Sequence, residues 1–596
     1  MSVTKETIEG HHSSALPERS EFEIAQKLEL RRTELLREAD IEERSTAHFK
    51  RPVENDFTKE ERATSTLLFG GLTLRHDSLV KAAAEGLGYR VDMIPTPVKP
   101  DFQAGKEYGN NGQCNPTYFT VGSLVNYLKR LRDEEGLSTE SILKNYSFVT
   151  ASACGPCRFG MYEAEYRLAL RNSGFDGFRV LLFQQKGGMA QSAEDAGLAL
   201  NLEFALALLN ALLVGDLLNE VAYQIRPYET EAGRTNSVFE KVVSRMQTSL
   251  RRENPETKKE GGLIGVVSKL LSPFAKSDDV SRILSQLFRE EFVSTMKECR
   301  TIIDEEIEVD FLRPRPICKV TGEFWAQTTE GDGNFHMFEF LESQGAEVLV
   351  EPIMTWINYL IAQGRSKQSD LKGLGMGSDA WSKLKAEADC RKKQLILDAA
   401  SRVLNREYDR MRNALGGTAH AQIDQLELQR IADPYYNRKS GGGEGHLEVA
   451  KNIYYSNKSL AHMVISLKPF GCMPSTQSDG AQAAVMSHYP DMIYIPIETS
   501  GEGDVNAHSR AQMALGEAKL KCKREFKECV ESTGYSLDEI REYCASHQEL
   551  RRPLQRIAHQ EGIVGRGANF ALHVGALMKA DSSFARPGVE TAVAAR

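Results

Sequence analysis

The stretch Thr150-Ala-Ser-Ala-Cys154-Gly-Pro-Cys157-Arg-Phe-Gly160 places two cysteines between a predicted strand and a predicted helix. Residues 146–150 are aromatic and β-branched, which is typical of a buried strand. Residues 161–170 contain strong helix formers with an apolar stripe. Unpaired N–H groups and the positive end of the helix dipole favour thiolate over thiol at a helix start. We therefore expect anionic sulfur here.

A Cys-x-x-Cys pair alone has four interpretations. It fits a redox dithiol, half of a zinc site, part of an iron–sulfur site, or two small buried side chains. The choice depends on cysteines elsewhere in the chain.

The composition excludes some classes of function. The 596 residues carry 74 Lys and Arg against 83 Asp and Glu, a net charge of −9, without a long basic run, which disfavours nucleic-acid binding. No apolar run reaches the ~18 residues of a membrane span, and the N-terminus lacks a signal core. We expect a cytoplasmic protein whose ten cysteines are reduced and serve as metal ligands, reactive groups or core residues.

The alternation of strand and helix patterns predicts an α/β fold. A strand at 67–74, a helix at 75–86 and a strand at 89–95 form a β-α-β unit. A helix from Asn115 and a strand at 178–184 extend it into an open, mainly parallel sheet. These residues predict a doubly wound lobe.

Strand patterns return in the second half of the chain, with long helical patterns between and after them: 318–324, 347–351, 463–467 and 492–496. The predicted fold is two Rossmann-like doubly wound lobes with a helical insert and a helical C-terminal tail. The expected parts are a helical N-terminal extension (1–60), a first lobe (60–215), a helical segment (216–310), a second lobe (311–530) and a helical tail with a disordered end (531–596).

Two further cysteines occupy loops like that of the first pair. Cys114 lies in a loop rich in glycine and asparagine directly before a helix, and Cys472 follows a strand of the second lobe between glycine and prolines. Paired α/β lobes bind ligands in the crevice at their strand carboxyl ends, so we expect Cys114, Cys154, Cys157 and Cys472 to converge there. Four thiolates suit zinc or an iron–sulfur cluster, and the long separations favour a redox cluster between the lobes.

The remaining cysteines lie in helical patterns beside charged residues, where a structural role is favoured, except for one that opens a strand and fits either role. The helical ones are Cys299, Cys390, Cys522, Cys529 and Cys544, and the strand one is Cys318.

Several polar residues are candidate catalytic groups. Arg75, His76 and Lys468 flank the predicted crevice, where they would hold an anionic substrate or supply protons; surface or capping roles are the alternative. Glu330 and Glu498 stand next to glycines and would act in acid–base chemistry or gating. Helix N-capping explains both carboxylates nearly as well.

Six segments within residues 60–530 resemble a known family: Thr73–Asp77, Asn110–Pro116, Cys154–Gly160, Gly322–Ala326, Lys468–Ser475 and Glu498–Asp504. They are similar to the acyl-CoA dehydratase activase-related proteins. These are relatives of the 2-hydroxyacyl-CoA dehydratase subunits and of the double-cubane-cluster reductases.

The resemblance implies two Rossmann-like lobes around a cysteine-bound iron–sulfur cluster. Because only four well-placed cysteines are visible, [4Fe–4S] is favoured, and a double cubane, which uses more ligands in the relatives, is the alternative. It also implies an anaerobic enzyme that receives single electrons from an activase ATPase. This chain lacks a Gly-x-x-x-x-Gly-Lys-Ser/Thr loop, so the ATPase would act in trans. A homo-oligomer or a larger complex is compatible with such a system.

In this interpretation four thiolates would ligate iron: those of Cys114, Cys154, Cys157 and Cys472. Backbone N–H groups of the surrounding loops, at Asn111, Gly155 and Gly471, would donate to sulfur and tune the potential.

We expect an iron–sulfur electron-transfer or reductase component. The near alternative is a dehydratase-like enzyme that forms a ketyl radical from a 2-hydroxyacyl-CoA. A zinc-stabilised scaffold and a dithiol enzyme that needs only Cys154 and Cys157 are the other hypotheses.

Overall fold

The computed structural model describes most of the chain: residues 21–39, 57–58, 60–152, 155, 157–184, 202–251, 290–371, 380–441 and 443–581. The chain divides into two compact units, 1–53 and 54–596. The first unit contains α1 (Glu21–Glu38), an exposed helix with ion pairs along its surface such as Arg31–Glu34. This helix lies within the helical N-terminal extension (1–60) expected from the sequence.

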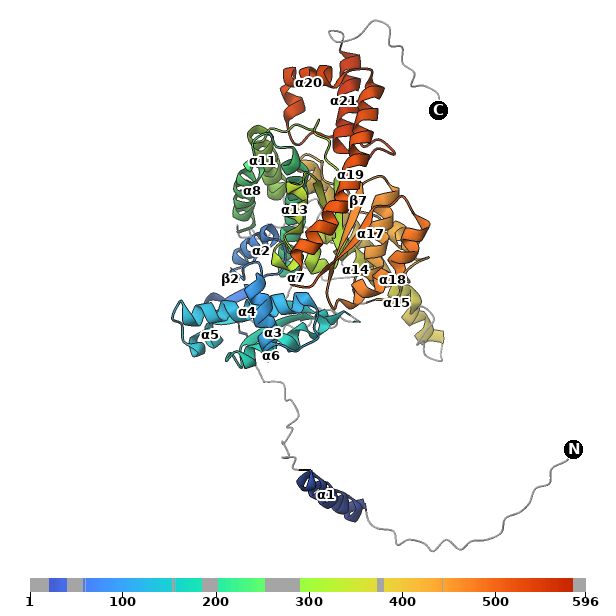
Figure 1. The fold of residues 1–596 in the computed structure, drawn as a ribbon. Coiled ribbons are helices and arrows are strands. Elements are labelled where there is room, and N and C mark those ends of the chain that lie inside the picture. Colours follow the sequence, from blue (N-terminus) through green and yellow to red (C-terminus); the bar gives the residue numbers. More distant parts are fainter. Residues whose placement is uncertain are drawn as a thin grey trace, which may run out of the picture. The chain divides into compact units, whose positions relative to one another are not determined.

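The second unit begins with a four-stranded parallel sheet in the order β2-β1-β3-β4, and Figure 1 labels its edge strand β2. Its strands are β1 (Thr66–Phe69), β2 (Arg90–Met93), β3 (Tyr146–Ser152) and β4 (Arg179–Gln184). Its helices are η1 (Glu60–Ala63), α2 (Leu74–Gly86), α3 (Lys99–Tyr108), α4 (Asn115–Asp133), α5 (Thr139–Asn145), η2 (Arg158–Met161) and α6 (Tyr162–Asn172).

A second parallel sheet repeats this order as β6-β5-β7-β8. Its strands are β5 (Ile317–Gly322), β6 (Glu347–Val350), β7 (Met463–Pro469) and β8 (Tyr494–Thr499). Its helices are α12 (Phe324–Thr328), η5 (Asp332–Asn334), α13 (Met337–Ser343), α14 (Ile353–Asp370), α15 (Ala380–Ala414), α16 (Gln425–Ala432), α17 (Gly445–Asn457), α18 (Met473–His488) and α19 (Asp504–Thr533).

The other helices build a separate apolar core that includes parts of α2, α14 and α15. They are α7 (Leu202–Ile225), η4 (Arg226–Tyr228), α8 (Arg234–Arg251), α11 (Glu290–Glu306), α20 (Leu537–Ser546), η6 (Gln548–Arg551) and α21 (Arg566–Ala580). Among the described residues, only Phe204–Tyr228 is long and apolar enough to cross a membrane, and 67% of its most apolar window is buried inside the fold. That burial is compatible with a core helix of a soluble protein.

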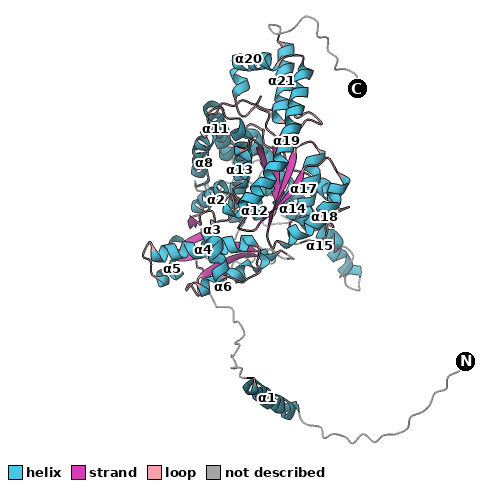
Figure 2. Cartoon of the chain, viewed as in Figure 1, coloured by secondary structure: helices cyan, strands magenta, loops and turns pink. Residues whose placement is uncertain are grey.

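Helices cover the sheets of both lobes (Figure 2). In the second lobe, α13 and α19 pack on one face and α17 and α18 on the other. In the first lobe, α4 and α6 cover one face through residues such as Leu124 and Leu170. The opposite face meets α2 and the start of α7, and it is here that the fold leaves a cavity.

The predicted fold class is confirmed: two doubly wound α/β lobes, with helical segments between and after them. The largest difference from a predicted strand boundary is at β1, which ends at Phe69 rather than at residue 74. Gly71 has φ +106°, and Thr73 caps α2 by accepting a hydrogen bond from the backbone N–H of His76. This cap signal overrides the apolar strand pattern. The end of the tail, which was predicted to be disordered, lies outside the described residues, the last of which is 581.

Candidate functional site

In each sheet the second strand along the chain is added on one side of the first strand, and the later strands are added on its other side. The order therefore reverses once in each sheet. In these orders the reversal falls between β1 and β3 and between β5 and β7, and open α/β sheets bind ligands outside the carboxyl ends of such strands. A cavity of about 500 Å³ is lined by residues at or just beyond the carboxyl ends of all four of these strands: Gly70 and Gly71, Thr150 and Ala151, Glu323 and Phe324, and Cys472 and Met473. Both reversal points therefore open into one cavity.

Three cysteines from the two lobes line this cavity: Cys114, Cys157 and Cys472. Each stands directly before a helix, at the N-terminal cap of α4, η2 and α18 respectively. A proline occupies the first turn of both α4 and α18, where its missing N–H costs nothing. The structure thus places these three predicted ligands at one cavity.

The loop of Cys114 is in direct contact with the loop of Cys472. Gly471 has φ +77°, and a Cβ atom there would lie 3.3 Å from Cα of Cys114. The backbone N–H of Asn115 donates to the carbonyl oxygen of Phe470 at 3.1 Å, and its side-chain amide donates to the carbonyl of Thr499 at 2.7 Å. These hydrogen bonds hold together two loops whose cysteines are more than 350 residues apart in the sequence.

Cys157 meets the second lobe through a different glycine. A Cβ atom on Gly443, whose φ is +123°, would lie 2.3 Å from Cγ of Pro474 and 3.7 Å from Cβ of Cys157. Only glycine fits this position, since both the backbone angle and the space exclude a side chain.

The Cys114 loop is also fixed within its own lobe. The buried carboxylate of Glu165, on α6, accepts hydrogen bonds from Asn110 and Gln113. The sulfur of Cys114 lies 3.1 Å from Oγ1 of Thr117 and 3.3 Å from the hydroxyl of Tyr162.

Burial changes the protonation expected for these thiols. Desolvation raises the pKa of Cys157 to about 12 and also raises the pKa of Cys472, and the carboxylate of Glu323 adds to both shifts. Of these two cysteines, only Cys157 belongs to the stretch for which the helix start predicted a thiolate. Burial outweighs the dipole there, so the thiol is its resting form without a bound metal, and burial acts in the same direction on Cys472. A bound metal centre reverses this balance, since a coordinating thiol is deprotonated.

Three carboxyl groups that the sequence analysis did not select also line the cavity: Asp77, Glu323 and Glu444. Burial raises the pKa of Asp77 and of Glu323 to about 7, and that of Glu444 well above its ordinary value. Glu323 caps α12 by accepting the N–H of Ala326 at 3.0 Å. A signal for Glu323 was present in the sequence, since it lies at the carboxyl end of the predicted strand 318–324 of the second lobe.

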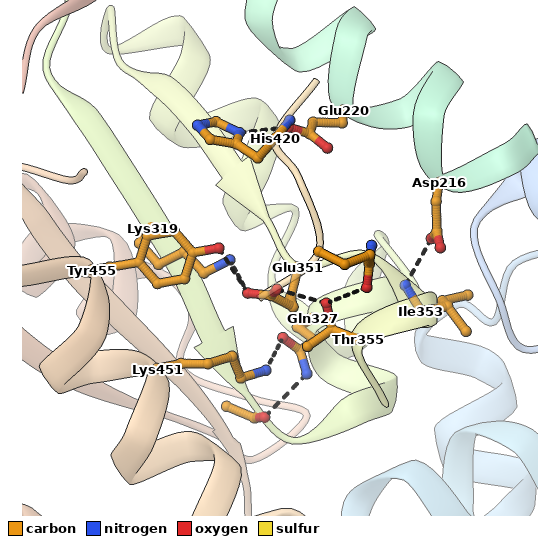
Figure 3. Close-up of polar contacts among 12 residues, drawn as sticks. Asp216, Glu220, Lys319, Gln327, Glu351, Ile353, Thr355, His420, Lys451 and Tyr455 are labelled. Carbon is orange, nitrogen blue, oxygen red and sulfur yellow. Dashed lines mark hydrogen bonds and ion pairs between the residues drawn. The ribbon is translucent and has the colours of Figure 1, made fainter. Parts of the chain in front are cut away.

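A buried layer of charged side chains lies behind the part of the cavity lining that Glu323 and Glu444 form (Figure 3). The side chain of Gln327 donates to Glu444 at 3.3 Å and accepts from the ammonium of Lys451 at 3.4 Å. Nearby, Lys319 pairs with Glu351 at 2.8 Å with both side chains almost fully buried. The cavity is thus backed by a fixed polar layer on the side of the second lobe.

Arg75 and His76 lie at another place. His76 is buried and contacts Asp216 of α7 at 3.2 Å, in a separate small hollow. Arg75 donates to Asn219 of α7 at 2.9 Å. Neither side chain lines the cysteine cavity, and both join α2 to α7.

Lys468, Glu330 and Glu498 are likewise absent from the cavity lining. Lys468 is buried and bonded to Glu448 and to the first turn of α18. Glu330 accepts the backbone N–H of Glu339 at 2.8 Å, which is the capping role given as its alternative. Glu498 is exposed on β8.

The remaining predicted ligand and loop residues are placed as follows. Cys154 lies outside the described residues, while Gly155 and Asn111 are exposed. In the part of the chain that the structure describes, no group of three or more His, Cys, Asp or Glu side chains is arranged to hold a metal ion. The cysteines assigned structural roles, and Cys318, do not line the cavity.

The sequence matches no protein-family model and no curated protein. The family resemblance therefore remains an expectation drawn from the six sequence segments.

Proposed function

We propose that this chain is the iron–sulfur component of a low-potential electron-transfer or reductase system, with Cys114, Cys154, Cys157 and Cys472 as ligands. The observation that carries this proposal is that thiols from both lobes line one cavity, at the strand reversals of both sheets.

The residues present fit such a cofactor. Three of the four proposed ligands are thiols at helix N-terminal caps. Backbone N–H groups of Phe159 and Ser475 donate to the sulfur atoms of Cys157 and Cys472, whereas the N–H of Asn115, next to Cys114, donates to Phe470. A bound cluster would supply one-electron transfer at a potential set by charge, hydrogen bonds and solvent exposure. The protein would contribute burial, which excludes water, and glycine contacts that hold the two loops in register.

The proposed partner is an activase-type ATPase that acts in trans and delivers single electrons. A cytoplasmic location accords with this role and with the mostly buried apolar helix α7. A homo-oligomer or larger complex is part of the same proposal.

Metal and sulfide analysis of the anaerobically purified chain tests the proposal. We expect brown protein with iron and acid-labile sulfide in comparable amounts, and an electron paramagnetic resonance signal after reduction. Colourless protein with zinc and no sulfide would favour the scaffold hypothesis, and metal-free protein would favour the dithiol hypothesis. Either result would refute the proposal, whereas turnover of a 2-hydroxyacyl-CoA by the brown protein would select the dehydratase alternative.

A further inference from the structure

The cysteine cavity continues well beyond the sulfur atoms. Its far end lies over the first sheet, where four strand residues form the floor: Leu67, Phe69, Val91 and Val149. Leu67 and Val91 are direct neighbours across the β1–β2 pair. The floor is therefore the sheet face opposite to the one packed by α4 and α6.

Three helices border this floor, and each contributes side chains from one of its faces. Spacings of three and four residues place these side chains on one helix face. They are Asp77, Val80 and Ala84 of α2; Phe204, Leu208 and Leu212 of α7; and Ile353, Trp356, Ile357 and Leu360 of α14. Such stripes normally interdigitate with a sheet at high density, but here they surround open space.

The lining is almost free of charge. Among the described lining residues, only Asp77, Arg158, Glu323 and Glu444 are charged types, and nine are aromatic. Arg158 donates to the carbonyl oxygen of Gly112, in the Cys114 loop. The described lining of the far end thus contains no arginine or lysine of the kind that recognises phosphate or carboxylate groups.

Asp77 of α2 is an acidic residue in the lining of this apolar end. Its side chain is buried, at 6% exposure, and its carboxyl group accepts backbone hydrogen bonds from Leu72 and Gly71, but its Oδ1 atom has no hydrogen-bond partner among the described residues. A buried oxygen without a partner costs about 1–3 kcal/mol, so such atoms in native proteins call for an explanation. A ligand with one hydrogen-bonding group would supply the missing partner.

We propose that the far end of the cavity binds a neutral, largely apolar organic molecule that carries one hydrogen-bond donor directed at Asp77. The cavity volume of about 500 Å³ falls within the usual range for small-molecule sites. The inference deepens the proposed function by naming the class of molecule that would bind next to the cluster. Only the placement of that molecule beside a cluster rests on the proposed function. A CoA thioester would have to keep its phosphates outside the described lining.

Fluorescence titration of the full-length protein with N-phenyl-1-naphthylamine, a neutral aromatic amine, tests the inference. Two of the three tryptophans, Trp325 and Trp356, line the cavity, and the third, Trp381, is 74% exposed. We expect saturable binding with emission sensitised by tryptophan. Trp356→Phe should reduce the sensitised emission, and Trp381→Phe should leave most of it.

Substitutions and probe analogues locate the site. Ala84→Phe, which fills the far end, should weaken binding about tenfold or more, an effect of about 1.4 kcal/mol. The matched control Leu520→Phe, on the exposed face of α19, should not change it. Asp77→Leu should weaken binding of the amine but not of 1-phenylnaphthalene, which lacks the N–H group, and 8-anilinonaphthalene-1-sulfonate should bind at least about tenfold more weakly.

Absence of saturable binding, equal effects of the two tryptophan substitutions, or tighter binding of the sulfonate would overturn the inference. Iron and sulfide analysis of the same samples separates this failure from failure of the proposed function. Probe binding without iron would support the apolar binding site and refute the proposed cluster. Iron without probe binding would support the cluster and refute the apolar binding site.

Discussion

Lys468, a candidate catalytic residue from the sequence, is fixed beneath the Cys472 loop instead. Its ammonium lies 3.3 Å from Glu448 and 2.6 Å from Asp479, and donates to Ser478 and to the carbonyl of Ser475. These carboxylates raise its pKa in spite of burial. The lysine thereby holds the first turn of α18, which positions Cys472.

Lys468→Met should lower the free energy of unfolding by about 3–5 kcal/mol, because it leaves the buried carboxylate of Glu448 without its cation. Urea denaturation measures the change. Lys521→Met, which breaks an exposed pair with Glu517, serves as the control and should cost less than about 1 kcal/mol. A Lys468→Met/Glu448→Gln double variant should recover part of the loss, and a single variant as stable as the wild type would show that Lys468 has no such role.

Glu351 gives the fold a defined acid sensitivity. Burial opposes its ionisation, but Lys319 and Lys451 outweigh this and lower its pKa to about 2 (Figure 3). The pKa of Lys319, lowered by burial to about 8, keeps the lysine charged at neutral pH. The folded pKa of Glu351 is below its ordinary value, so the stabilisation is complete above about pH 4.5 and is lost as the pH falls toward 2.

We expect urea denaturation at a series of pH values to show about 3 kcal/mol of acid-dependent stability from this group. Glu351→Gln should be less stable at neutral pH and should show a shallower loss between about pH 4.5 and 2. An unchanged acid slope in that variant would contradict the assignment.

Sequence reasoning identified the cysteines of the site but not its carboxyl groups. Cys114, Cys157 and Cys472 were predictable because glycines and prolines mark loops at helix starts. Glu323 and Glu444 also stand beside glycines at helix starts, but the sequence does not show their burial, which raises their pKa values. The same limitation applies to Lys468, whose partners on α17 and α18 only the fold brings together.

At the level of elements, α3 and α4 are packed unusually closely through two glycines. A Cβ atom on Gly105 would lie 1.9 Å from the carbonyl oxygen of Tyr118, and one on Gly122 would lie 1.7 Å from that of Asp101. Because Cys114 caps α4, the contact also fixes the position of a proposed ligand.

Gly122→Ala should force the helices apart and cost about 1–3 kcal/mol or more, with lower iron content. The matched control is Gly480→Ala on the exposed side of α18, where a Cβ atom meets nothing within 4 Å. That variant should gain about 0.5–1 kcal/mol from helix propensity. Thermal unfolding compares the two, and equal effects would refute the close-packing argument.

The elements themselves were largely predictable. Strands such as β3 and β7 are short, apolar and β-branched, and their observed bounds lie within three residues of the predicted ones. The close contact of α3 and α4 was not predictable, because a glycine in a helix signals close packing only once its neighbour is known.

At the level of the whole molecule, two sheets with the same strand order direct their reversal points at one cavity. The sequence predicted both lobes and a shared crevice. It did not predict the long apolar extension over the first sheet, because α2, α7 and α14 come from different parts of the chain and meet only in the folded protein.

The most direct test of the central claim is the iron and sulfide content of Cys472→Ala after anaerobic purification, compared with Cys299→Ala. Cys472 is the one proposed ligand from the second lobe, whereas Cys299 is buried in the helical core and does not line the cavity. We predict that Cys472→Ala loses most of its iron and sulfide while Cys299→Ala keeps both. Full iron and sulfide in Cys472→Ala would contradict a centre shared by the two lobes.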